Sequence, residues 1–299
     1  MNTDVQATPR SALNHWRDYL ELCKPKVVLL LVFTAIVGML LSTPGFVPLT
    51  NFVFGTIGIG LASASAAAIN HIIDHRTDAQ MARTKNRPLP KGNLTMTQCL
   101  VFALSIGVIS MVLLVAFVNA LTAVLTFLSL IGYAVIYTLY LKRATPQNIV
   151  IGGAAGAMPP VLGWAAITGD VTAESLLLFL IIFTWTPPHF WALAIHRIDD
   201  YAKVGIPMLP VTHGERFTRL QVLLYTILMV LVTLLPYLIG MNGVLYLAGA
   251  VGLGIGFLYS AIKMMDEDRK DQPIETFVFS INYLMALFAF LLVDHYLML

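Results

Sequence analysis

Residues 52–78 read FVFGTIGIGLASASAAAINHIIDHRTD, an apolar run that ends in polar and acidic residues. The first charged residue is Asp74, so the run from Phe52 to Ile73 is long enough for a helix to cross a bilayer, which takes about 20 apolar residues. The run lacks the strict alternation of apolar and polar residues that a membrane β-strand needs. The small residues from Ala62 to Ala68 let another helix approach closely. We therefore predict a membrane-spanning helix with polar groups at one end.

Eight more apolar runs of comparable length occupy most of the rest of the 299-residue chain. They are Val27–Leu41, Cys99–Phe117, Ala120–Tyr140, Ile149–Ile167, Leu176–Ile195, Leu220–Ile239, Val244–Met264 and Phe277–Leu297. Hydrophobic residues make up 58% of the chain and charged residues 11%, against about 25% charged residues in soluble proteins. This composition excludes a disordered chain, a secreted disulfide-rich domain and a free nucleic-acid binder. We predict an all-α, polytopic membrane protein: a cytoplasmic segment, residues 1–22, followed by one domain of nine transmembrane helices, residues 23–299.

The basic residues lie on one side of these runs. All 18 Lys and Arg fall in the N-terminal segment or in the loops after the second, fourth, sixth and eighth runs, with their flanks. Because basic loops stay in the cytoplasm, we predict a cytoplasmic N-terminus and a C-terminus, at Leu299, on the opposite side. Asp18 and Glu21 argue against an organelle transit peptide, which is poor in acidic residues. We expect the bacterial inner membrane as the location.

Three polar residues at the end of the Phe52–Ile73 run form the first candidate site. Asn70, Asp74 and Asp78 are four residues apart, so they share one face of a helix. Two carboxylates stacked in this way repel each other, and they also oppose the helix dipole near its C-terminus. A cation between them removes both penalties. The all-oxygen ligand set suits Mg²⁺, which takes one or two carboxylates and completes its shell with water and phosphate oxygens.

The basic residues that follow point to a diphosphate. Arg83, Lys85 and Arg87 alternate, and Pro88 disfavours helical geometry at Arg87, so we expect an extended segment that aims all three cations at the carboxylates. Cations facing metal-binding carboxylates are the arrangement that a metal-bound diphosphate needs. The alternative is a solvated loop whose basic residues only set the topology.

Two further polar groups can reach the same cytoplasmic end of the predicted helices. Lys142 and Arg143 follow Tyr137 at the end of the fourth run, where they either join the site or only mark topology. The sixth run ends in a second acidic cluster, Asp199 and Asp200. That cluster either holds a second metal ion or balances neighbouring basic residues.

His189 is a polar residue inside the sixth run. It follows Pro187–Pro188, which should kink the helix, and it lies among Trp185, Phe190 and Trp191. An intramembrane ionisable residue is a site hypothesis by default, and aromatic faces stabilise cations. The alternative is a histidine that only hydrogen-bonds a neighbouring helix.

The pattern N-x3-D-x3-D-x4-R-T-x-N-R-P, from Asn70 to Pro88, resembles the first signature of the UbiA-type intramembrane prenyltransferases. Four later segments are similar to those of the haem-modifying branch of this superfamily: LKR at 141–143, GAMPP at 156–160, PPHFW at 187–191 and GIPMLPV at 205–211. The resemblance extends from about Leu22 to the end of the chain. Nine helices with a cytoplasmic N-terminus also fit the superfamily.

The resemblance implies that farnesyl diphosphate alkylates a vinyl group of haem b, with addition of water, to give haem O for terminal oxidases. It implies Mg²⁺ as cofactor, and contact with membrane lipid and with haem A synthase or a terminal-oxidase assembly, but no nucleic acid. Many members carry a second Asp-x3-Asp pair. Here Asp199 and Asp200 are followed by Tyr201 and Lys203, so the number of metal ions stays open.

The resulting expectations can be grouped by role. The catalytic set is Asn70, Asp74, Asp78 and Asp200; the diphosphate set is Arg83, Lys85, Arg87, Lys142, Arg143 and Lys203; the haem and prenyl pocket is Tyr137, Trp185, His189 and Trp191; the metal ligands are Asn70, Asp74, Asp78, Asp199 and Asp200. Ligation of the haem iron by His189 is one hypothesis within this set.

Three other functions remain as alternatives. A prenyltransferase of the same superfamily can use another aromatic or chlorin acceptor. A transporter of an anionic metabolite would have polar, Gly- or Pro-broken helices that meet near the middle of the bilayer. A membrane scaffold would tolerate the change Asp74→Asn.

Overall fold

The computed structural model describes residues 12–298, and within that range it contains helices and no strands. The predicted all-α class is confirmed. The start of the predicted N-terminal segment, residues 1–11, and the C-terminal Leu299 lie outside the described residues.

Within residues 12–298, eight helical stretches are long and apolar enough to cross a membrane. They are α3 (Leu49–Asp78), α4 (Met96–Phe117), the series α5 (Ala120–Ile131), η1 (Gly132–Leu141) and α6 (Lys142–Ala144), the pair α7 (Asn148–Ala157) and α8 (Pro159–Thr168), α9 (Ala173–His196), the pair α12 (Glu215–Thr233) and α13 (Leu235–Leu238), α14 (Val244–Lys263) and α15 (Gln272–Met298). The helix α9 continues through Pro187 and Pro188, the position at which the sequence predicts a kink.

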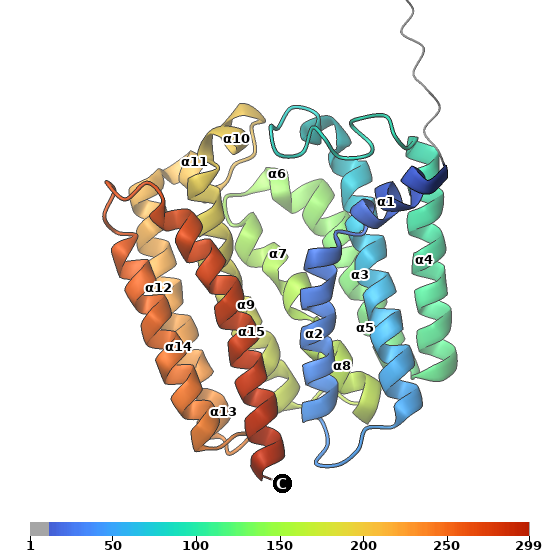
Figure 1. The fold of residues 1–299 in the computed structure, drawn as a ribbon, viewed down its shortest axis with the longest axis vertical. Coiled ribbons are helices and arrows are strands. Elements are labelled where there is room, and N and C mark those ends of the chain that lie inside the picture. The colour runs from blue at the N-terminus through green and yellow to red at the C-terminus, as the bar shows by residue number, and fades with distance from the viewer. Residues whose placement is uncertain (1–11, 299) are drawn as a thin grey trace, which may run out of the picture.

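The ninth span is a bent pair of helices. The helix α2 (Pro25–Leu41) has 17 residues and qualifies only together with the end of α1 (Ala12–Leu22), to which it is inclined by 51°. Figure 1 shows α1 lying across one end of the bundle, where its buried Leu22 joins a hydrophobic cluster with residues of α3 and α4. The described residues therefore contain eight candidate spans, or nine if the bent pair counts as one. The sequence did not indicate the helix α1.

Small residues let neighbouring helices approach closely. Ser65 on α3 donates a hydrogen bond to the carbonyl oxygen of Ala103 on α4 (2.8 Å), and Ser110 on α4 donates one to Gly58 (2.6 Å). A Cβ at Gly38 on α2 would overlap the backbone of α8 at Pro160. Such close contacts stabilise helix pairs in lipid, where the hydrophobic effect does not drive association.

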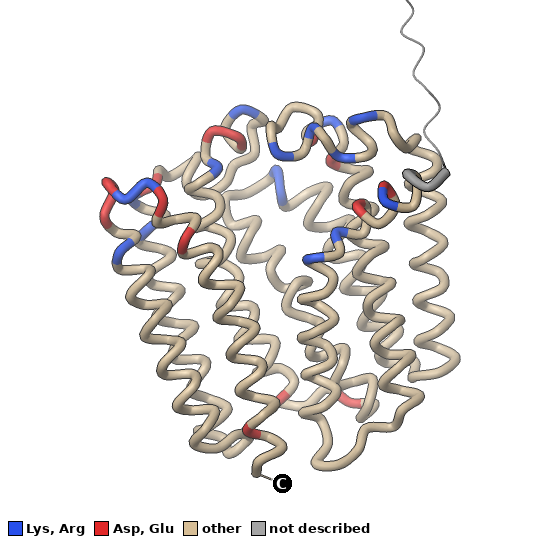
Figure 2. Tube along the Cα trace, in the orientation of Figure 1, with Lys and Arg blue, Asp and Glu red and all other residues tan. Residues whose placement is uncertain are grey.

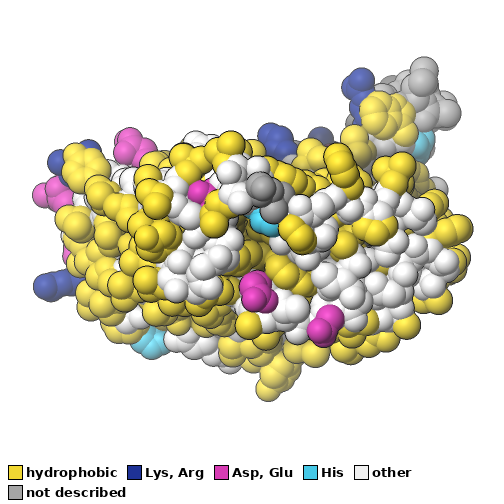
Figure 3. Space-filling model, turned by 90° about the horizontal axis from the view of Figure 1, so that it is seen from below, with side chains coloured by type: hydrophobic (Ala, Val, Ile, Leu, Met, Phe, Trp, Pro, Cys, Tyr) yellow, Lys and Arg dark blue, Asp and Glu magenta, His cyan; other side chains and the backbone are white. Residues whose placement is uncertain are grey.

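Charge separates the two ends of the bundle. Figure 2 shows the described Lys and Arg residues gathered at one end, which we call the charged end, together with most of the acidic residues. The short helices α10 (Ile198–Lys203) and α11 (Leu209–His213) also lie there. The opposite end, seen in Figure 3, is largely apolar with a few acidic side chains. This separation agrees with the predicted alternation of basic loops.

The helix α9 is the central element of one half of the bundle. Its buried residues pack in one cluster with α2, α12, α14 and α15, and in a second cluster with α7, α11 and α12. This position holds the inner face of α9 rigidly below the charged end.

Candidate active site

The last two turns of α3 form a buried polar surface at the charged end. Asn70, Asp74 and Asp78 are 4%, 2% and 4% exposed. The amide of Asn70 donates a hydrogen bond to Oδ2 of Asp74 (2.9 Å), so these two side chains share one face of the helix. Helical geometry places the three residues together, as their spacing of four predicts.

Three cations converge on these side chains, and two of them, Lys24 and Lys142, come from distant parts of the chain. Nζ of Lys142 lies 2.6 Å from Oδ2 of Asp74, and Nη1 of Arg87 lies 2.5 Å from Oδ2 of Asp78. Nζ of Lys24 donates a hydrogen bond to Oδ1 of Asn70 (2.5 Å). We call these six residues the α3 polar cluster: Lys24, Asn70, Asp74, Asp78, Arg87 and Lys142.

Sequence reasoning missed Lys24. It stands between α1 and α2, outside both helices, with the left-handed backbone φ of 49°. No local motif marks this residue, because only the bend between α1 and α2 brings it to α3.

Thr138 contacts the α3 polar cluster, and the sequence did not reveal this residue either. It lies on the π-helix η1, where its hydroxyl contacts the carbonyl oxygen of Tyr133 (2.8 Å) and accepts a hydrogen bond from the amide of Asn70 (3.2 Å). Wide π turns inside helices often occur at functional sites. Here the π-helix also carries Tyr137, which stacks on Tyr133 and packs against Gly152 of α7.

Several buried polar atoms of this region have no partner. Oδ1 of Asp74 makes no hydrogen bond to any residue in the range 12–298, and neither does either ring nitrogen of the adjacent His71. A buried carboxylate oxygen without a partner is costly, so the site suits a ligand that supplies positive charge. The donor set of Asn70, Asp74 and Asp78 therefore fits a hard divalent cation. Among the described residues, no cluster of three or more His, Cys, Asp and Glu side chains could hold a metal by itself.

The basic segment after α3 does not have the extended form that we predicted. Residues 82–86 form turns, in which the amides of Thr84 and Lys85 both donate to the carbonyl oxygen of Met81. The buried hydroxyl of Thr84 donates to the carbonyl oxygen of Asp78 (2.9 Å) and ties the turns to the helix end. Arg83 and Lys85 are exposed, and only Arg87 reaches a carboxylate. These local hydrogen bonds outweigh the preference of the residue before a proline for an extended backbone.

Arg143 lies next to the cluster and not within it. Its Nη2 donates to the hydroxyl of Thr77 (3.0 Å), on another face of α3. It lines a polar cavity of about 480 Å³ together with Arg76, Gln80 and Gly205. Its neighbour Lys142 therefore occupies the polar cluster, while Arg143 faces a separate recess.

The second acidic cluster stands at the same end but outside the α3 polar cluster. Asp199 is exposed, and Asp200 is half-buried with its carboxylate 4.0 Å from Arg197, three residues earlier. Lys203 is exposed. Burial raises the pKa of the Tyr201 phenol, and the charges of Arg83, Arg197 and Arg87 partly oppose that rise.

The predicted aromatic group of α9 divides between two places. His189 stacks on Trp185 (ring centroids 4.2 Å apart) and on Phe277 of α15 (4.5 Å), and its Nδ1 lies 2.6 Å from the hydroxyl oxygen of Ser280. We call these four residues the α9–α15 joint. Trp191 instead packs edge-on against Tyr225 of α12, so it does not line the same surface as His189. A turn of about 200° separates positions 189 and 191 on a helix.

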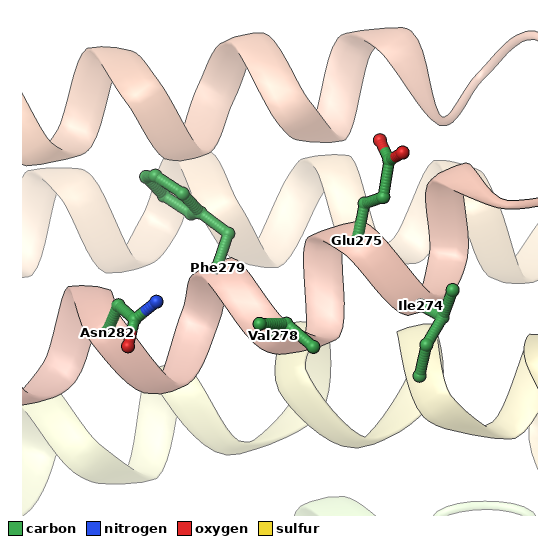
Figure 4. A pocket seen from close by; sticks show the side chains of 5 residues that line it. All are labelled: Ile274, Glu275, Val278, Phe279 and Asn282. Atoms are coloured by element: carbon green, nitrogen blue, oxygen red, sulfur yellow. The ribbon is translucent and has the colours of Figure 1, made fainter.

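The pocket shown in Figure 4 is not part of either region. It measures about 430 Å³ and is lined by the α15 residues Ile274, Glu275, Val278, Phe279 and Asn282. None of the residues that the sequence predicted for the site belongs to it.

Fold and site together define a multi-pass membrane protein with a buried acidic surface and converging cations at its charged end. The chain belongs to the UbiA prenyltransferase family, whose model matches residues 31–289. It is 60% identical to the protoheme IX farnesyltransferase of Thioalkalivibrio sulfidiphilus, over 96% of this chain and 95% of that protein.

Two solved structures share the fold. A digeranylgeranylglyceryl phosphate synthase aligns with a TM-score of 0.78 and 20% identity, over 94% of this chain and 98% of that chain. A UbiA homologue from Archaeoglobus fulgidus bound to GPP and Mg²⁺ aligns with a TM-score of 0.62 and 15% identity, over 92% and 99%.

Proposed function

We propose that this chain transfers the farnesyl group of farnesyl diphosphate to a vinyl group of haem b and adds water there, which gives haem O. Membership of the UbiA family supports prenyl transfer, and the relative that is 60% identical is named for the farnesylation of protohaem IX. The single observation that carries the proposal is the α3 polar cluster, in which one buried oxygen of Asp74 has no partner within residues 12–298 while three cations converge.

The leaving group defines the role of the cations. When the C–O bond of farnesyl diphosphate breaks, negative charge grows on the diphosphate. Lys24, Lys142 and Arg87 stand where they can bind its oxygens, and buried cations stabilise developing charge more strongly than solvated ones. Arg83 and Lys85 are exposed at the charged end. We therefore propose that they attract the diphosphate from solution.

Asn70, Asp74 and Asp78 would hold Mg²⁺, which the Archaeoglobus fulgidus homologue binds together with GPP. When bound, the ion neutralises diphosphate oxygens and makes the diphosphate a better leaving group. Asp200 and Asp199 are candidates for a second ion, and Asp200 is the less exposed of the two. Before the ion binds, the ion pairs of Asp74 with Lys142 and of Asp78 with Arg87 hold the two carboxylates in place.

Carbon–carbon bond formation requires a dry environment. The farnesyl carbon that loses diphosphate bonds to the outer vinyl carbon, water adds to the inner vinyl carbon, and a proton is released. Tyr133 and Tyr137 stack on each other in η1, the same π-helix whose Thr138 accepts a hydrogen bond from Asn70, and Trp185 contributes a further ring from α9. Aromatic faces stabilise a carbocation and exclude water that would quench it.

The cellular setting follows from the same proposal. The charged end would face the cytoplasm of a bacterium, by the positive-inside rule, and the spans would lie in the inner membrane. Both substrates are apolar enough to reach the bundle from lipid. The product haem O implies a partner that receives it, either a haem A synthase or a terminal-oxidase assembly.

The test is a product assay with purified protein, Mg²⁺, farnesyl diphosphate and haem b, followed by mass analysis of the extracted haem. We expect haem O, and we expect Asp74→Asn to abolish it while Asp170→Asn, an exposed carboxylate at the opposite end, leaves it unchanged. Replacing haem b by 4-hydroxybenzoate tests another acceptor. Prenylation of that acceptor alone would contradict the haem assignment, and counterflow of an anion without bond cleavage would indicate a transporter.

The structure offers little support for transport. The break between α7 and α8 at Met158 is flanked by the buried residues Ala157 and Pro159, both apolar. A transport site would place polar groups at such a break near the middle of the bilayer. The buried carboxylates Asp74 and Asp78 instead lie at the charged end, and the buried Asp294 of α15 is hydrogen-bonded to Asn242 and to the backbone of Gly243 and Tyr246.

A further inference from the structure

Two side chains of α9 meet one residue of α15. Nε1 of Trp185 donates a hydrogen bond to the carbonyl oxygen of Ser280 (2.9 Å), and Nδ1 of His189 lies 2.6 Å from the hydroxyl oxygen of the same serine. Ser280 is fully buried, and His189 is 7% exposed. The α9–α15 joint is therefore a packed contact with a defined hydrogen-bond pattern.

The pattern fixes the position of the proton on His189. The Ser280 hydroxyl has one hydrogen, and its oxygen lies 2.6 Å from the carbonyl oxygen of Phe277, which can only accept. If Ser280 gave its hydrogen to His189 instead, two lone pairs would face each other across that short distance. The serine therefore donates to Phe277 and accepts from Nδ1–H of His189. It follows that Nε2 carries no proton and has a free lone pair.

We propose that Ser280 is a positioning residue that holds His189 in this tautomer, and that Nε2 of His189 binds the iron of the haem substrate. The inference rests on the proposed function, because it requires haem as acceptor. Neutral imidazole nitrogen is a common ligand of haem iron, and a ligating histidine usually donates its other ring N–H to a neighbouring group. Ser280 is that neighbour here.

The surroundings of the ring favour this role over a purely structural one. Trp185 and Phe277 stack on the ring with interplanar angles of 19° and 26°, and Phe190 contacts it edge-on. The ring cannot turn without breaking these contacts, so its free nitrogen keeps one direction. Trp185 already links α9 to Ser280 without help from His189. Among the described residues, no group accepts or donates a hydrogen bond at Nε2 of His189.

Ligation would place the acceptor relative to the leaving group. His189 is two turns from the end of α9 at the charged end, near which the α3 polar cluster lies. A haem held by its iron has a fixed position for its vinyl groups, which makes the choice of one vinyl group a consequence of geometry.

The experiment measures haem binding without farnesyl diphosphate, so it does not depend on turnover. Purified protein is titrated with haem b, and visible absorption and resonance Raman spectra report the iron–histidine bond. We expect His189→Gly to lose that bond and added imidazole to restore it. Ser280→Ala should keep the bond with a shifted iron–histidine frequency and roughly tenfold weaker haem binding, as for other lost partners of metal-bound histidines. Ser280→Thr, which retains the hydroxyl, should restore both.

The possible outcomes separate a failure of this inference from a failure of the proposed function on which it rests. If the unmodified protein binds no haem, the proposed function fails. If it binds haem and the spectrum of His189→Gly is the same, the inference is overturned and the proposed function stands. His295→Ala, on the end of α15 that contacts Thr43, is the matched control and should keep the unmodified spectrum. An equal loss in that control would also overturn the inference. Rescue by imidazole excludes misfolding as the cause of the loss in His189→Gly.

Discussion

The α3 polar cluster and the α9–α15 joint are both buried polar sites, but they differ in how completely their atoms are paired. In the joint, Trp185, Ser280 and Nδ1 of His189 all have hydrogen-bond partners. In the polar cluster, Oδ1 of Asp74 is buried and has no hydrogen-bond partner in the described part of the chain. Paired atoms fix the geometry of a region, whereas an atom with no partner among the described residues, such as Oδ1 of Asp74 or Nε2 of His189, indicates where a ligand binds. The comparison suggests that one region binds and activates a charged substrate while the other positions an apolar one.

Among changes to the cations and to the joint, the largest effect should follow from removing a buried cation of the polar cluster. Lys142→Met takes away the partner of Asp74 and a contact to the leaving diphosphate. We expect turnover to fall about 100-fold, the loss typical of removing one donor from a charge-stabilising site. The measurement is the initial rate of haem O formation. Lys270→Met, an exposed lysine at the same end, serves as control, and an equal loss there would contradict the special role of the cluster.

A smaller effect should separate the basic residues that the sequence treats alike. Arg87→Lys shortens the side chain that binds Asp78 and removes its planar geometry. We expect a loss of about tenfold in kcat/KM, since a charged hydrogen bond contributes about 1.5 kcal/mol. Arg83→Lys keeps an exposed positive charge and should lose much less. Equal losses at both positions would favour the extended arrangement that the structure does not have.

The smallest effect should come from the paired region. Trp185→Phe keeps the ring stack on His189 but removes the hydrogen bond to the Ser280 carbonyl. We expect about 1 kcal/mol less unfolding free energy, measured by denaturant titration in detergent, and turnover that falls less than in Lys142→Met. A loss of turnover as large as that of Lys142→Met would mean that the joint does more than position a substrate.

The sequence predicted those features that depend on residues close together in the chain. Apolar run length identified the spans, and the alternation of basic loops identified the charged end, because both properties belong to contiguous residues. The spacing of Asn70, Asp74 and Asp78 placed them on one face for the same reason. These are consequences of helical geometry.

The remaining features depend on contacts between distant segments. Lys24 and Thr138 reach Asn70 from 46 and 68 residues away, through a helix bend and a π-helix that no local pattern indicates. The turns that expose Arg83 and Lys85 arise from hydrogen bonds to Asp78 and Met81, which outweigh the alternation of charges. Trp191 is two residues from His189 in sequence but faces Tyr225 on another helix.

The most direct test of the central claim is the release of diphosphate from farnesyl diphosphate, measured in the presence of haem b with and without Mg²⁺. The account predicts rapid release by the unmodified protein with Mg²⁺. It predicts almost none after chelation by EDTA or in the double variant Asp74→Asn, Asp78→Asn, even where circular dichroism shows an intact helical fold. Undiminished release by the double variant, or in EDTA, would contradict the claim that these two carboxylates and a divalent ion activate the diphosphate.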